Sequence, residues 1–293
     1  SPQIIYPKPD HIRCTSNALS QTSIMNLKTL SFLFAALFTL VSCGNQPATT
    51  DEASASMATT PSAKAPATFA DKVAAAHARA DFKAYEAVQF DIQLFFGGSE
   101  RLNGTITLST DSRRGVVATK DGTQVFFQDS KVFCAPETEN MAGTRFMAYT
   151  WAYFYMLPYK LNDPGTVWND YPDKKLNDKT YLTSKLSFEP GTGDAPDDWY
   201  VLYADPDSKL LQVAAYIVTA GQDQAEAEKD PHAIEYLNYQ TTGGIPIATE
   251  WKFWGWQADQ GLTDQLGNAN LSNIRLLKSA GDVFTPPTNF IEG

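Results

Sequence analysis

The sequence predicts a mainly β protein of the α+β class, built as an antiparallel meander. Stretches of alternating apolar and polar residues recur from residue 88 onward, and short turn sequences such as Asp121-Gly122 separate them. A helical pattern precedes these stretches at residues 69–86, and an unusually aromatic stretch at residues 144–159 interrupts them. We therefore expect one leading helix, a run of locally paired strands and one helix inserted midway.

The leading helix has a start signal and an apolar stripe. Thr68 is placed to cap it, and Asp71 three positions later makes a variant of the capping box. Phe69 and Val73 fall on one face, and later apolar residues fall near the same stripe. Residues 69–86 are therefore predicted to be helical.

The strands are predicted from alternation and from the turns between them. In the first strand Phe90, Ile92 and Leu94 share one face, and polar residues occupy the other. Asp129-Ser130 suits a two-residue hairpin turn, because Asp tolerates a positive φ. The pattern predicts about eleven strands, at residues 88–96, 102–109, 114–119, 123–128, 131–135, 180–189, 199–204, 210–219, 232–240, 245–256 and 271–278.

The inserted segment, residues 144–159, carries bulky apolar and aromatic side chains on all sides of a helix rather than along one stripe. A helix that is apolar all round requires burial on all sides. We therefore expect this helix to lie against the sheet and to be covered on its other side as well.

The N-terminal part divides into three segments that precede the folded domain. Residues 1–24 have no hydrophobic period and precede Met25, so we interpret them as a spurious upstream or disordered segment. Residues 25–42 combine the cation Lys28 with a short apolar run, as in a secretory signal. Residues 43–67 are small and polar, which is typical of a flexible tether with a reach of roughly 25–30 Å.

The sequence Leu40-Val41-Ser42-Cys43 at the end of the signal resembles the lipobox of bacterial lipoproteins. That resemblance implies cleavage before Cys43, transfer of a lipid to its sulfur and acylation of the new N-terminus. The chain is therefore expected to be a lipid-anchored protein of the cell envelope, on the outer membrane, facing the periplasm or the cell surface. The apolar run is too short for a transmembrane helix, which needs about 20 residues.

Composition and motifs argue against several kinds of function. The formal net charge of −10 repels phosphate backbones, so no nucleic-acid partner is expected. His77 and His232 have no recognisable nucleophile nearby and are interpreted as helix-end or surface residues. Asp194 and its acidic neighbours are interpreted as a solvated turn, so no metal, no cofactor and no catalytic residue is predicted. Cys134 is expected to be a small buried apolar residue, since no second cysteine remains in the domain to pair with it.

Large rings occupy both faces of the strand at residues 245–256. Trp251 and Phe253 share one face, and Trp254 and Trp256 share the other. Such a strand is either enclosed in a packed core or has one face lining an apolar cavity. If Trp254 and Trp256 are exposed instead, their rings are suited to stacking on sugars.

The order of elements and three local motifs resemble the LolA/LolB/RseB superfamily. The motifs are Leu-Tyr-Ala-Asp-Pro at residues 202–206, Tyr-Gln-Thr-Thr-Gly-Gly-Ile-Pro at residues 239–246, and the aromatic segment running through residues 151–165. The last motif also resembles a little-characterised family of bacterial lipoproteins. The resemblance implies that residues 68–293 form an incomplete, strongly curved β-barrel whose concave apolar face is covered by helices. It also implies lipid binding without catalysis.

The hypothesis that follows is a monomeric, membrane-anchored, non-enzymatic lipoprotein that binds a lipid or a lipoprotein acyl chain. Because the superfamily's shuttling carriers lack an anchor, an anchored chain indicates a fixed binding, receptor or sensor role. The candidate lining residues are Trp151, Phe154, Trp251 and Phe253.

Two alternatives remain open. One is a module that binds carbohydrate or an envelope polymer through exposed tryptophans. The other is a hydrolase with a carboxylate pair, drawn from Asp91, Glu100, Glu189, Asp198, Glu235 and Glu250.

Overall fold

The computed structural model describes residues 67–138 and 140–293. The predicted upstream segment, the signal, the acylation site at Cys43 and nearly all of the tether lie outside the described residues. Residues 67–293 fall within one compact unit. Its N-terminal half contains α1 (Phe69–Ala76), α2 (Arg79–Phe82), β1 (Ala87–Phe96), β2 (Ser99–Ser109), β3 (Arg114–Thr119), β4 (Gln124–Gln128), β5 (Lys131–Cys134) and α3 (Met141–Lys160).

The C-terminal half adds nine strands and one short helix. These are β6 (Thr166–Asp170), β7 (Lys174–Leu176), β8 (Lys179–Phe188), β9 (Tyr200–Ala204), β10 (Leu211–Tyr216), α4 (Gln224–Ala227), β11 (His232–Thr242), β12 (Ile245–Gln257), β13 (Gly261–Leu277) and β14 (Ile291–Glu292).

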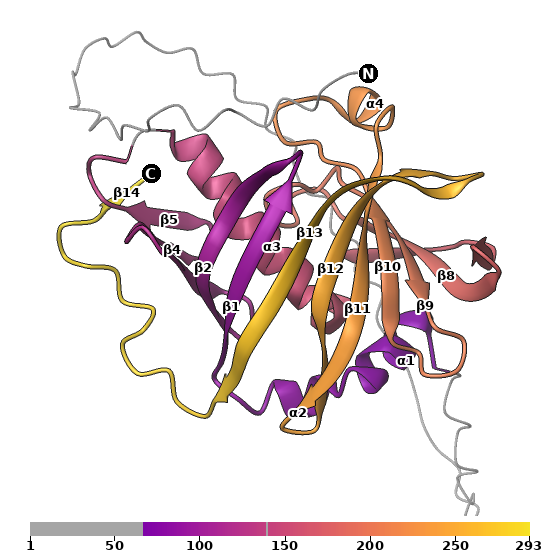
Figure 1. The fold of residues 1–293 in the computed structure, drawn as a ribbon, viewed down its shortest axis with the longest axis horizontal. Coiled ribbons are helices and arrows are strands. Elements are labelled where there is room, and N and C mark those ends of the chain that lie inside the picture. Colours follow the sequence, from indigo (N-terminus) through magenta and orange to yellow (C-terminus); the bar gives the residue numbers. More distant parts are fainter. Residues whose placement is uncertain (1–66, 139) are drawn as a thin grey trace, which may run out of the picture. The chain divides into compact units, whose positions relative to one another are not determined.

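The strands form one 14-stranded antiparallel sheet in the order β14-β5-β4-β3-β2-β1-β13-β12-β11-β10-β9-β8-β6, with β7 paired to β8 beside this path. Two locally connected meanders, β1–β5 and β8–β13, are joined where β1 pairs with β13. The described sheet ends at β14 and β6 and is open, so the predicted curved antiparallel half-barrel is confirmed. Figure 1 shows α3 crossing one face of the sheet behind β1 and β13.

Helix α3 connects the two margins of the sheet. It follows β5, which lies next to one end of the strand order, and precedes β6, which forms the other end. The chain therefore crosses the whole sheet within this one connection. That path explains why an apolar helix interrupts the meander.

The structure has more strands than the sequence predicted. The short strands β6, β7 and β14 have no clear alternation and gain their order by pairing with β8 or β5. The predicted strand 271–278 is only the end of β13, which is 17 residues long. The early part of β13 is polar and pairs with β12, which covers residues 261–270, and β1 pairs with residues 267–277 on the other side. Gly267 permits this, because a Cβ there would lie 2.3 Å from the Phe95 carbonyl oxygen.

The predicted helix 69–86 is shorter than expected. The capping box between Thr68 and Asp71 is confirmed, since each side chain accepts a hydrogen bond from the other's backbone N–H. The helix ends at Ala76 because Ala78 adopts a left-handed backbone conformation with φ of 50°. The short helix α2 then begins at Arg79.

His77 occupies the end of α1 and is buried, so its interpretation as a helix-end residue is confirmed and a surface position is wrong. Its Nε2 accepts a hydrogen bond of 3.0 Å from the backbone N–H of Leu211, at the start of β10. Its ring makes T-shaped contacts with the rings of Tyr159 and Tyr239. Burial lowers the pKa of His77 to about 3, so the imidazole is neutral and able to accept this bond.

Apolar side chains pack on both faces of the sheet. Trp251 and Phe253 point into the larger cluster with α3, whereas Trp256 and its neighbour Trp254 belong to a smaller cluster on the opposite face. The predicted division of this strand is therefore confirmed. Cys134 is fully buried in β5, as predicted.

Candidate ligand-binding cavity

One face of α3 packs tightly against the sheet. The ring of Tyr155 stacks on that of Phe90 in β1, with centroids 4.3 Å apart and an interplanar angle of 16°. Trp151 and Phe154 lie 5.8 and 6.1 Å from Phe253 in β12, measured between ring centroids. These contacts fix the helix on the sheet and turn its opposite face outward.

A proline inside α3 strengthens this attachment. Pro158 has no N–H, so it cannot donate to the carbonyl of Phe154 four residues earlier. The hydroxyl of Tyr236 in β11 donates to that carbonyl at 2.8 Å instead. The carbonyl that the proline leaves without its helical partner thus becomes a buried link between the helix and the sheet.

The outer face of α3 lines a cavity of about 780 Å³. The helix contributes Phe146, Tyr149, Tyr153 and Met156, spaced by three or four residues along one side. Several of these rings are half-buried rather than enclosed. The opposite walls come from both wings of the sheet and include Leu108, Phe127, Phe188, Tyr200, Tyr216 and Val218. The walls are predominantly apolar, and the volume falls within the range of about 300–1,000 Å³ that ligand sites occupy.

Polar links between α3 and two loops line one end of the cavity. Arg145 binds both carboxylate oxygens of Asp194 at 2.7 and 2.6 Å. The same guanidinium donates to the carbonyl of Ser130 at 2.7 Å, and the Tyr149 hydroxyl donates to the carbonyl of Asp129 at 2.6 Å. The hydrogen bonds with Asp194 raise the pKa of Arg145, so this end holds a firmly charged, internally paired cation.

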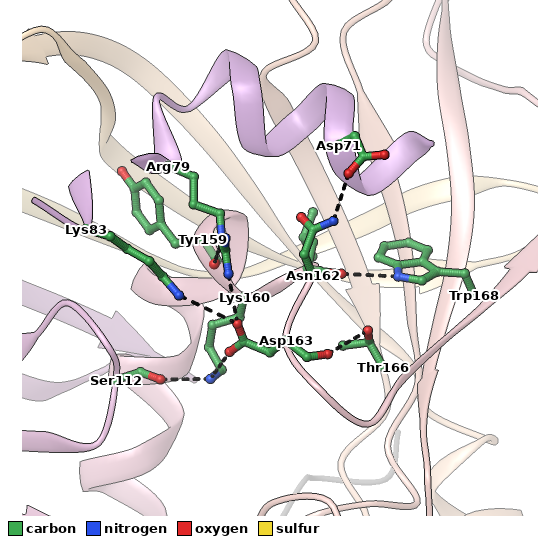
Figure 2. A network of polar contacts seen from close by, with 11 residues as sticks. Asp71, Arg79, Lys83, Ser112, Tyr159, Lys160, Asn162, Asp163, Thr166 and Trp168 are labelled. Carbon is green, nitrogen blue, oxygen red and sulfur yellow. Dashed lines mark hydrogen bonds and ion pairs between the residues drawn. The ribbon is translucent and has the colours of Figure 1, made fainter. Parts of the chain in front are cut away.

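The other end of the cavity meets a network of charged residues (Figure 2). Lys160 Nζ, at the end of α3, donates to Ser112 Oγ at 2.8 Å and to Asp163 Oδ2 at 2.9 Å. Arg79 Nη2 lies 3.2 Å from the other oxygen of Asp163, and Lys83 Nζ lies 3.9 Å from it. Ser112, Lys160 and Asp163 line the cavity.

A second, much smaller space of about 20 Å³ lies under α3, among His77, Tyr155, Tyr159 and Trp251. It has room for a single water-sized molecule. It is too small for an acyl chain, so the large cavity is the candidate site.

The four predicted lining residues are divided between these regions. Phe154 borders the large cavity and Trp251 borders the small one. Trp151 and Phe253 lie in the packed layer between α3 and the sheet. Ligand contact by these four residues stays a prediction. The outward-facing aromatic residues of α3 were not predicted to line the cavity, although the apolar character of the whole helix indicated that both of its sides are covered.

The residues that the two alternative hypotheses require are not exposed, lie outside the cavity or already make hydrogen bonds within the protein. None of the chain's six tryptophans is exposed, and the Trp256 N–H donates to the Tyr203 hydroxyl at 3.0 Å. Of the six candidate carboxylates only Asp198 borders the cavity, where it accepts hydrogen bonds from the Thr219 backbone and hydroxyl. Burial raises the pKa of Asp198. Neither alternative is favoured by this arrangement.

Residues 95–257, more than half of the chain, match the sequence profile of DUF6503, a family of unknown function. The chain belongs to the DUF6503 family. A comparison with proteins of curated function finds no match.

A comparison with solved structures gives three matches that each cover about three quarters of this chain. A LolA superfamily protein from Nitrosomonas europaea is 8% identical, with a TM-score of 0.47, and the match covers 73% of this chain and 97% of that one. A putative outer membrane lipoprotein-sorting protein domain from Vibrio parahaemolyticus is 12% identical, with a TM-score of 0.47 and coverage of 74% and 97%. A DUF1329 family protein from Desulfovibrio piger is 10% identical, with a TM-score of 0.48 and coverage of 73% and 95%.

Within residues 67–138 and 140–293, the structure contains no helix with the length and hydropathy needed to cross a bilayer. In the same part of the chain, no group of three or more His, Cys, Asp or Glu side chains is arranged to hold a metal ion.

Proposed function

We propose that this chain is a cell-envelope lipoprotein that binds a lipid or an acyl chain, without catalysis, in the cavity along α3. The observation that carries the proposal is the cavity of about 780 Å³ with predominantly apolar and aromatic walls. Between α3 and the sheet, aromatic side chains fill nearly all of the space. A guest therefore fits along the outer face of this helix.

The energetics favour an apolar guest. The half-buried rings of Phe146, Tyr149 and Tyr153 keep part of their surface in contact with solvent inside the cavity. An acyl chain that covers these rings removes apolar surface from water on both partners. Burial of each CH₂ group contributes about 0.8 kcal/mol. A chain of about twelve carbons therefore gives enough favourable free energy to offset the cost of association.

The binding proposal predicts a saturable site for an uncharged apolar fluorophore. We expect the full chain carrying Cys43→Ser to bind N-phenyl-1-naphthylamine with a rise in fluorescence. Val218→Arg places a charge at the cavity wall and should weaken binding at least about tenfold, because the guanidinium would be desolvated by the guest. The matched control is Val167→Arg at an exposed position of β6, which should stay within about twofold of the parent.

Two results would contradict the binding proposal. One is a parent protein that shows no saturable fluorescence change. The other is equal binding by the Val218→Arg and Val167→Arg variants, which would place the fluorophore outside the cavity.

The membrane anchor is the second part of the proposal, and it rests on the lipobox-like sequence that ends at Cys43. An acidic chain with a net charge of −10 has little electrostatic attraction to anionic lipids, so a covalent anchor supplies the attachment.

Acylation at Cys43 predicts incorporation of a labelled fatty acid. In a diderm bacterial host grown with radiolabelled palmitate, the parent chain should carry label and sediment with the membrane fraction. Cys43→Ser should lose both properties, and the matched variant Cys134→Ser should keep the label, because Cys134 is buried in β5. Label retained by Cys43→Ser would refute acylation at this residue.

A further inference from the structure

The cavity differs chemically at its two ends. At the Arg145 end the cation is held by two bonds to Asp194 and one to Ser130. At the other end Lys160 borders the cavity, and the cations of Arg79 and Lys83 lie behind it. At the second end the positive charge is therefore less completely neutralised by acidic side chains.

The charges of this network favour an added anion (Figure 2). Three cations, Arg79, Lys83 and Lys160, share the carboxylate of Asp163. Asp71 reaches the network through the amide of Asn162, at 3.1 Å from its nitrogen. The residues drawn together thus hold three positive and two negative charges. This local excess is notable in a chain whose formal net charge is −10.

Donors remain for a ligand at this end. An ammonium group has three N–H donors, and two of those of Lys160 are used by Ser112 and Asp163. The ammonium of Lys83 lies 3.9 Å from Asp163, beyond hydrogen-bonding distance. The side chains of Arg79, Lys83 and Lys160 keep 26%, 37% and 25% of their surface exposed. Of the three, Lys160 lines the cavity and can turn its remaining donor toward an anion.

We propose that this network binds the anionic head group, a carboxylate or a phosphate, of a single-chain amphiphile whose tail occupies the apolar cavity. Lys160 makes the direct contact, since it lies at the cavity wall. Arg79 and Lys83 hold Asp163 and so leave the ammonium of Lys160 able to serve the ligand. This inference rests on the proposed lipid-binding function and adds the charge and the orientation of the ligand.

The test compares head groups on one tail length. The measurement is displacement of N-phenyl-1-naphthylamine from the full chain carrying Cys43→Ser. The competitors are dodecanoate, dodecyl phosphate, dodecanol and dodecyltrimethylammonium. We expect the two anionic compounds to bind about tenfold more tightly than dodecanol, because charge-assisted hydrogen bonds form only with them. The cationic compound should bind more weakly than dodecanol.

The same comparison in Lys160→Gln locates the head group. The preference for dodecanoate over dodecanol should fall to about threefold or less, while the affinity for dodecanol itself is unchanged. Lys229→Gln is the matched control, because Lys229 is also paired with an acidic residue three positions away, Glu226. It should keep the full preference. Lys83→Gln provides a second variant at a more exposed position, and it should reduce the preference about twofold to threefold.

The outcomes separate this inference from the proposed function. If dodecanol binds as tightly as dodecanoate, or if Lys160→Gln keeps the preference, the head-group site is wrong and the apolar cavity stands. If neither the fluorophore nor any dodecyl compound binds, the proposed function itself fails. If the cation network only ties α2 to α3, the variants lower thermal stability and leave the preference unchanged, which also refutes the inference.

Discussion

Replacing Phe253 by alanine is expected to lower the free energy of unfolding by about 3–5 kcal/mol, since large-to-small changes in a packed core remove contacts and leave a void. Phe253 is fully buried, and its ring contacts those of Trp151, Phe154 and Phe96. Chemical denaturation of the parent and the variant measures the difference. The effect is large because the residue lies at the centre of the layer between α3 and the sheet.

The neighbouring Trp254→Ala supplies the comparison. Trp254 is half-buried on the other face of β12, and its N–H donates to Glu235 at 3.0 Å. We expect a loss of about 1–2 kcal/mol there. If Phe253 lines the ligand site instead, as the sequence predicts, its replacement should affect ligand binding more than stability. A stability change below about 1 kcal/mol for Phe253→Ala, with fluorophore binding abolished, would favour ligand contact over a packing role.

Acidification is expected to destabilise the protein through His77. The unfolded chain binds a proton at an ordinary histidine pKa of about 6.5, whereas burial lowers the pKa of His77 to about 3 in the folded state. Between these two pKa values the unfolded state therefore binds more protons than the folded state. The contribution of His77 to stability is fully present above the higher pKa and decreases as the pH falls toward the lower one. From pH 7.5 to pH 5 the free energy of unfolding should fall by about 2 kcal/mol from this residue.

His77→Gln is the variant that isolates this contribution. Glutamine does not titrate, and its side-chain oxygen can accept the Leu211 N–H in place of the imidazole. Burial also lowers the pKa of His232, so the variant should retain a smaller dependence of the same sign. Denaturation curves at several pH values give the comparison. Parallel pH profiles for the parent and His77→Gln would contradict the assignment.

The regular parts of the fold could be predicted from local sequence because they depend on period and turn chemistry. The alternation of β1 and the opposed faces of β12 are set by the two-residue repeat of a strand. The Asp129 turn follows from a residue that tolerates the φ of 52° found there. Strand β13 shows the limit of this reasoning. Its first part is polar and pairs with β12, and its continuation from Gly267 pairs with β1, which is far away in the sequence.

The candidate site was predicted in its general character but not in its location. Residues 144–159 indicated a helix covered on all sides, and one side is covered by the sheet while the other borders the cavity. The sequence cannot distinguish those two sides, because both carry large rings. The size of Trp151 and Phe253 and their place in the pattern predict lining residues, and in the structure both rings pack in the layer between α3 and the sheet. The walls that face Tyr153 come from distant wings of the sheet.

The attachment of α3 to both margins of the sheet has a mechanical consequence. Because α3 follows β5 and precedes β6 in the chain, we expect displacement of the helix by a guest to be transmitted toward both margins of the sheet. Packed interiors carry such displacements instead of absorbing them. We therefore expect a loaded and an empty molecule to differ in the spacing of β5 and β6, a difference that a neighbouring protein could detect without reaching the guest.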